Sequence, residues 1–73
     1  MNQTKYAVVI EKGATSYGAY VPDLPGCVAT GATIEEVEAE IREAITLHLD
    51  GLREDGIPAP QPSSQVEYVD VAA

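Results

Sequence analysis

The sequence is poor in the residues that reinforce small domains. Its 73 residues include one cysteine, one histidine, no tryptophan and no phenylalanine. One cysteine excludes an internal disulfide, and a single Cys with a single His cannot supply a structural metal site. A chain of this length buries only about 60% of its unfolded surface when it folds. We therefore expect one domain, residues 1–73, that is reinforced by self-association as a homo-oligomer, either a dimer or a tetramer.

Positive charge and long apolar runs are also scarce. Four basic residues stand against twelve acidic ones, so the formal net charge is -8. This charge repels nucleic-acid phosphates and anionic lipids and attracts basic partners, although acidity can also serve only to keep a small protein soluble. The sequence lacks both the roughly 20 consecutive apolar residues that span a bilayer and a secretory signal pattern. We expect a cytoplasmic protein with no direct nucleic-acid or membrane binding.

Short apolar segments separated by turn-forming residues fill the first half of the sequence. Strands are predicted near residues 5–11, 17–22 and 27–31, where β-branched residues and tyrosines recur. Pro22 and Pro25 exclude helix from the loop between the last two of these strands. The first strand has apolar residues on both faces, so one face is expected to meet a helix and the other to need a partner.

A helix is predicted near residues 33–54. Thr33 and Glu36 fit a capping box, in which each side chain bonds the other residue's amide. A proline-rich connector follows, and alternating apolar residues predict a last strand near residues 65–71. The expected fold class is α+β, with the order β-β-β-α-β, a four-stranded sheet and one helix on one face. The apolar stripe of the helix contains Ile34, Val37, Ile41, Ala44, Ile45, His48 and Leu52, with Leu49 at its edge.

The sequence offers no convincing catalytic residue, metal ligand or cofactor motif. His48 lies on the apolar stripe without an identifiable nucleophile, carboxylate or companion ligand, so it is interpreted as a half-buried structural side chain. Cys27 opens a strand rather than a helix, so no helix dipole lowers its pKa and a packed side chain is expected. We therefore expect a protein that is not an enzyme and needs no cofactor.

Acidic residues and one leucine occupy the face of the helix opposite the stripe. This face could bind a basic partner around its leucine, or it could be a solvated surface whose leucine packs against another subunit. The loop that precedes the third strand offers further contacts, although its residues could instead be core or simply shape the turn. The predicted partner-binding residues are Tyr20, Asp23, Leu24, Glu36, Glu40, Glu43, Leu47, Asp50 and Glu54.

Three segments together resemble the HicB-like antitoxin family. They are residues 6–10, Tyr-Ala-Val-Val-Ile; residues 17–27, with the Val-Pro-Asp-Leu-Pro-Gly-Cys loop; and the helix start Thr-Ile-Glu-Glu at 33–36. The resemblance covers about residues 5–70. It implies a fold similar to a partial RNase H fold without the nuclease's carboxylates, self-association, and binding to a small basic HicA-type toxin. Such a toxin is an mRNA interferase with a fold like a double-stranded-RNA-binding domain.

The leading hypothesis is thus a HicB-like antitoxin of a type II toxin-antitoxin system. Many members of the family continue into a C-terminal DNA-binding domain, whereas this sequence stops at Ala73, so the resemblance gives no basis for expecting operator binding. The alternative is an orphan homo-oligomeric protein-binding module with another partner. A residual nuclease is suggested only by the RNase H-like fold.

Overall fold

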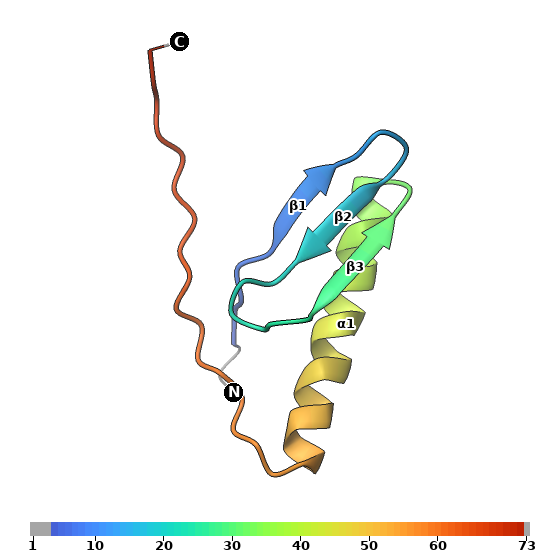
Figure 1. Ribbon diagram of the computed structural model, residues 1–73, viewed down its shortest axis with the longest axis vertical. Coiled ribbons are helices and arrows are strands. Elements are labelled where there is room, and N and C mark those ends of the chain that lie inside the picture. Colours follow the sequence, from blue (N-terminus) through green and yellow to red (C-terminus); the bar gives the residue numbers. More distant parts are fainter. Residues whose placement is uncertain (1–3, 73) are drawn as a thin grey trace.

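Three strands and one helix make up the folded body of the protein. The computed structural model describes residues 4–72, and in chain order these contain β1 (Val9–Lys12), β2 (Tyr17–Tyr20), β3 (Val28–Gly31) and α1 (Ile34–Glu54). The strands form one antiparallel sheet in the order β1-β2-β3, and α1 lies across one face (Figure 1). The helix packs on β3 and β2 rather than on β1. The predicted α+β class and the order of these four elements are confirmed.

The register of the sheet sorts its side chains onto two faces. Ala19 lies opposite both Ile10 and Ala29, and Tyr20 lies opposite both Val9 and Val28. Because neighbouring residues of a strand point to opposite faces, the buried Ala19 and its partners face the helix. The row of Val9, Tyr20 and Val28 therefore faces outward, and residues 4–72 supply no second layer over it. β1 therefore has apolar side chains on both faces of the sheet, as expected.

Gly31 allows the helix to start directly against the end of β3. A Cβ atom at this position would lie 2.6 Å from the backbone nitrogen of Val37, which is closer than atoms can pack. Thr33 is the N-cap residue, and the Glu36 amide donates to its hydroxyl oxygen at 3.0 Å. This bond is the first half of the predicted capping box. The close approach and the cap together determine where the helix begins and how near it lies to the sheet.

The core lies between the sheet and the first half of α1. Val37 is fully buried and Ile41 nearly so, whereas the later members of the predicted stripe are half-buried and Ile34 is 44% exposed. The predicted stripe is therefore confirmed as the core-facing side of the helix at Val37 and Ile41, whereas Ile34 is more exposed than expected for a core residue. The six buried hydrophobic residues are Ala19, Val21, Leu24, Cys27, Val37 and Ile41.

The loop between β2 and β3 turns inward, which corrects the expectation that it displays Leu24. The Leu24 amide donates to the Val21 carbonyl oxygen, and the Cys27 amide donates to the Leu24 carbonyl oxygen, both at 3.0 Å. Gly26 completes the turn with a φ of 84°. These bonds close the loop over the sheet end and direct the Leu24 side chain into the core, where its exposure is 0%. Leu24 therefore packs rather than being presented to a partner.

The prediction of a fourth strand near residues 65–71 is wrong. Within residues 4–72 the sheet has three strands, and the segment from 57 to 72 runs beside the body as an extended chain (Figure 1). Alternating apolar residues favour an extended backbone, but a strand also needs an edge to pair with. The residues just before the predicted strand are bonded to the body, since Pro60 accepts from the Tyr6 hydroxyl and Ser63 and Ser64 donate to Asp23, and residues 65–71 pair with no sheet edge. In this same part of the chain, no helix combines the length and apolar character needed to cross a membrane.

Candidate protein-binding site

A shallow hollow with an acidic rim lies between β3 and α1. Its volume is about 360 Å³. Leu47 from the helix and Val28 from the strand both line it, and each is 64% exposed. Glu43 stands one turn before Leu47 and Glu40 two turns before it on the same helix face, so carboxylates border the apolar floor. The hollow is lined by Val28, Ala29, Thr30, Glu40, Glu43, Ala44 and Leu47.

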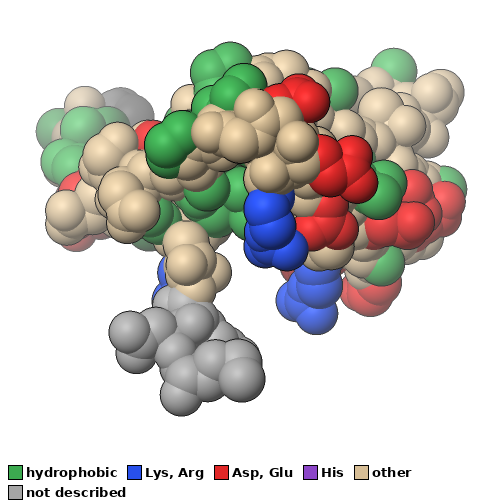
Figure 2. Space-filling view, turned by 90° about the horizontal axis from the view of Figure 1, so that it is seen from below, with side chains coloured by type: hydrophobic (Ala, Val, Ile, Leu, Met, Phe, Trp, Pro, Cys, Tyr) green, Lys and Arg blue, Asp and Glu red, His purple; other side chains and the backbone are tan. Residues whose placement is uncertain are grey.

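The other predicted acids extend this surface along the helix. Figure 2 shows acidic side chains gathered on the helix side of the molecule, with exposed apolar side chains among them. Asp50 forms an ion pair with Arg53 at 3.5 Å, but both side chains are more than half exposed, so water screens the pair. The acidic ridge, as we call it, consists of Glu36, Glu40, Glu43, Leu47, Asp50 and Glu54, and all six are exposed.

β3 contributes residues to this site that were not among the predicted partner-binding residues. Val28, Ala29 and Thr30 belong to a strand with small residues, Ala29 and Gly31 among them. Those small residues are the reason for the hollow, because they leave space beside the helix that larger side chains would fill. Tyr20 lies opposite Val28 in the register and is 41% exposed, so it extends the surface onto the outer face of the sheet.

Asp23 binds the protein's own C-terminal segment. The amides of Ser63 and Ser64 both donate to its Oδ2 at 3.0 Å, and their hydroxyls donate to its Oδ1 at 3.0 and 2.8 Å. The Ser64 amide, followed by the other three donors, lowers the pKa of Asp23 to about 2. We call these three residues the Asp23 clip. In this conformation the carboxylate holds residues 63 and 64 against the β2–β3 loop.

Acidification should release the Asp23 clip. Because the folded pKa of about 2 lies below the ordinary value of 3.8, the clip stabilises the closed segment fully above about pH 4 and loses this effect as the pH falls towards 2. An NMR titration should show the Ser63 and Ser64 amide signals shifting with the Asp23 carboxyl carbon. The variant Asp23→Asn should show the low-pH amide positions already at pH 7. Amide signals that stay constant while the carboxyl titrates would contradict the clip.

Cys27 and His48 are the residues with possible chemical reactivity, and within residues 4–72 neither is part of a catalytic arrangement. Cys27 is 3% exposed within the core, as predicted, and burial raises the pKa of its thiol. His48 is half-buried on α1. Among residues 4–72, no group of three His, Cys, Asp or Glu side chains is placed to hold a metal ion.

The folded body is a small α+β domain, in which one helix covers a three-stranded sheet and an acid-rimmed apolar hollow lies between the helix and β3. The chain belongs to the HicB-like antitoxin family: the family model described as "HicB_like antitoxin of bacterial toxin-antitoxin system" matches residues 6–72. The predicted family membership is thereby confirmed. The match includes the β2–β3 loop, the helix and the extended segment, so all parts of the site lie within it.

Similar proteins come from a phage, from bacteria and from archaea. The chain is 36% identical over 64 residues to an uncharacterized 14.9 kDa protein of Haemophilus phage HP1, covering 88% of this chain and 48% of the relative. It is 49% identical over 47 residues to a UPF0150 protein of Helicobacter pylori, covering 64% of this chain and 65% of that protein. The chain thus spans about half and about two thirds of these two relatives' lengths.

A solved structure shares the fold. It is described as "HicA3 and HicB3 toxin-antitoxin complex", and the matched chain superimposes with a TM-score of 0.70 at 30% identity. The match covers 82% of this chain and 70% of the other. The fold of this chain is therefore shared with a chain of a solved toxin-antitoxin complex.

Proposed function

We propose that this chain is an antitoxin that binds and neutralises a small basic HicA-type mRNA interferase. The observation that carries the proposal is the exposed Leu47, which stands in the hollow beside Glu40 and Glu43 on a chain with a net charge of -8. A mostly exposed leucine bordered by carboxylates suits a basic partner with an apolar knob or pocket. The family and the complexed structural neighbour support the same assignment.

The two kinds of residue would have separate roles in this contact. The carboxylates of the acidic ridge would steer a cationic toxin towards the helix and raise the association rate, an effect that added salt screens. Leu47 and Val28, which lose water on contact, would supply most of the affinity. Tyr20 would contribute at the rim. Blocking of the toxin's active site by this surface requires binding alone and no chemistry from the antitoxin.

Inhibition of RNA cleavage tests the proposal directly. The gene neighbouring this one is examined for a short basic reading frame, and its product is incubated with RNA in the presence of increasing amounts of this protein. Cleavage should stop at a stoichiometric ratio, and the association rate should fall steeply as ionic strength rises. Cleavage that continues in the presence of excess antitoxin, or an association rate indifferent to salt, would contradict the proposed role of the ridge.

We also propose that the protein self-associates, whether or not a toxin is its partner. Four large apolar residues beyond Ser64 are exposed in the single chain, and within residues 4–72 the outward row of β1, β2 and β3 lacks a covering layer. An exposed apolar surface of this extent is typical of an interface. Light scattering on the isolated protein at high concentration measures this property without a toxin, and a monomer would count against it.

A further inference from the structure

We propose that residues 65–71, which we call the tail, dock in the groove between β1 and α1 of a second copy of this chain, so that two copies exchange tails. This inference deepens the proposed self-association and is independent of toxin binding. The exchanged tail would form the fourth strand of the partner's sheet, beside β1. It would then cover apolar side chains that the single chain leaves open.

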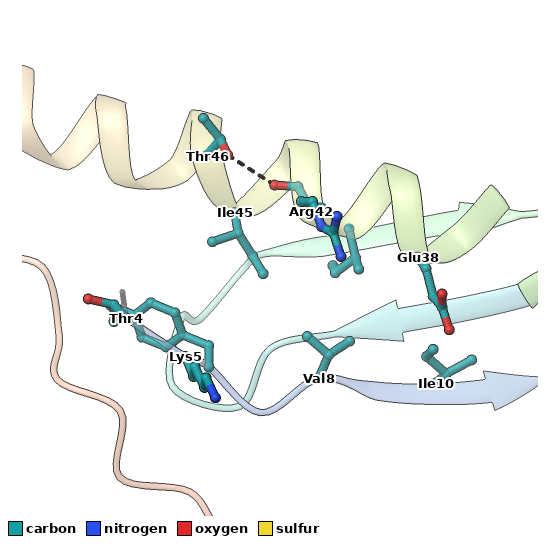
Figure 3. Close-up of a pocket in the computed structure, with 10 residues that line it drawn as sticks. Thr4, Lys5, Val8, Ile10, Glu38, Arg42, Ile45 and Thr46 are labelled. Atoms are coloured by element: carbon teal, nitrogen blue, oxygen red, sulfur yellow. Dashed lines mark hydrogen bonds between the residues drawn. The ribbon is translucent and has the colours of Figure 1, made fainter. Parts of the chain in front are cut away.

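The receiving groove is open and apolar. Its volume is about 550 Å³. Tyr6, Val8 and Ile10 line it from β1 and the segment before it, while Ile41 and Ile45 line it from α1. In Figure 3, Val8 and Ile10 point up towards the helix and Ile45 points down towards the strand, with space between them. The groove exists because α1 packs on β3 and β2, which leaves the β1 side of the sheet uncovered.

β1 also offers a free backbone edge along this groove. One side of β1 pairs with β2, and within residues 4–72 no strand pairs with its other side. An edge of this kind is a template for an added strand, because its amides and carbonyls lack ladder partners. Main-chain pairing with β1 and side-chain burial in the groove would therefore act together, which is how added strands bind.

The tail has the composition of a strand, and its large apolar side chains stay exposed among residues 4–72. Val66, Tyr68, Val69 and Val71 are 54%, 94%, 76% and 77% exposed. Apolar residues stand at both even and odd positions of the tail, so a strand formed here would have two apolar faces. This pattern is typical of a strand that is covered on both faces. Left in water, such a segment is a liability for aggregation, so a defined docking site is expected.

Contacts at the base of the tail direct it away from its own groove. The Asp23 clip attaches Ser63 and Ser64 to the β2–β3 loop, and the Tyr6 hydroxyl donates to the Pro60 carbonyl oxygen at 2.6 Å. Beyond these contacts the chain diverges from β1 (Figure 1). The connector before the clip contains Pro58, Pro60 and Pro62, which favour a stiff extended backbone. A stiff connector that holds a strand outside its own fold favours exchange between identical copies.

Charge also matches the tail to the groove. Lys5 and Arg42, two of the chain's four basic residues, line the groove together with one acid, Glu38. The tail carries Glu67 and Asp70 and no basic residue. On a chain with a net charge of -8, a groove with an excess of positive charge is the surface where an acidic tail meets least repulsion.

Loss of the tail should abolish self-association without unfolding the body. A chain ending at Ser64 and the variant Val69→Asp should both be monomers by light scattering, with unchanged helical circular dichroism, whereas the full chain is a dimer or larger. Ile34→Asp, a matched change of an exposed apolar residue that lies outside the groove, should leave the assembly intact. A monomeric full chain would overturn the proposal. So would an assembly that survives the loss of the tail, although such an assembly would leave the proposed self-association and the toxin assay unaffected.

Cross-linking distinguishes a second copy from the chain's own groove. The double variant Val8→Cys with Tyr68→Cys is treated with a short bifunctional maleimide, and the buried Cys27 stays unreactive. Exchange predicts covalent dimers, and it also predicts cross-linked heterodimers when the two single-cysteine variants are mixed. A double variant that is cross-linked only within one chain would show that the tail closes on its own groove, and would overturn exchange.

Discussion

Replacing Leu47 by aspartate should abolish neutralisation of a HicA-type toxin while leaving the fold intact. Leu47 is 64% exposed, so the change costs the free protein little, but it puts a charge at the centre of the proposed contact. Central apolar anchors typically contribute about 2 kcal/mol or more, so affinity should fall by at least about 30-fold. Calorimetric titration with the toxin and the RNA cleavage assay measure the loss.

A second variant on the same helix controls for the effect of added charge. Ile34→Asp also replaces an exposed apolar residue of α1, at 44% exposure, but Ile34 lies outside the hollow. It should bind the toxin nearly as well as the unaltered protein, because acids near a helix start are favourable and the contact surface is unchanged. Equal loss in both variants would show that the hollow is not the contact.

Replacing Leu24 by alanine should destabilise the protein severely. Leu24 is one of two fully buried side chains among the described residues, and truncating a buried leucine typically costs about 2 to 5 kcal/mol. Small domains have about 5 to 15 kcal/mol in total, so a large part of the stability would be lost. The unfolding midpoint, followed by circular dichroism, should fall by about 10 °C or more.

Leu47→Ala is the matched control for this stability experiment. The substitution is chemically the same, but at an exposed site it should change the free energy of unfolding by less than about 0.5 kcal/mol. If both alanine variants unfolded at the same temperature, Leu24 would not be a core residue and the β2–β3 loop would be open in solution. The pair therefore tests the inward turn of the loop separately from any partner.

The helix and the hairpin could be predicted because their signals are local. The capping box of Thr33 depends on a residue three positions away, and the apolar stripe depends on the helical repeat alone. The acidic ridge was predictable for the same reason, since spacing along a helix determines which side chains share a face. Its companion residues on β3 were not, because a hollow arises only when two elements lie side by side.

The loop and the tail show where local signals end. The prolines around Leu24 correctly predicted a turn, but whether a turn points its central side chain inward or outward depends on the bonds that close it. The tail carries a valid strand pattern, but pairing needs an edge, and the clip between Asp23 and residues 63–64 joins positions 40 and 41 apart in sequence. A repeat of apolar residues along the sequence cannot predict a contact between residues so far apart.

The sequence by itself determined the elements of this protein, its acidity and its membership of the HicB-like antitoxin family, because composition, caps and repeats act over a few residues. The tertiary structure decided which side chains are available. It buried Leu24, paired Leu47 with Val28 in one hollow, engaged Asp23 with the chain's own serines and left the β1 groove open beside an unpaired tail. These outcomes depend on how distant segments pack, and packing is a property of the whole chain.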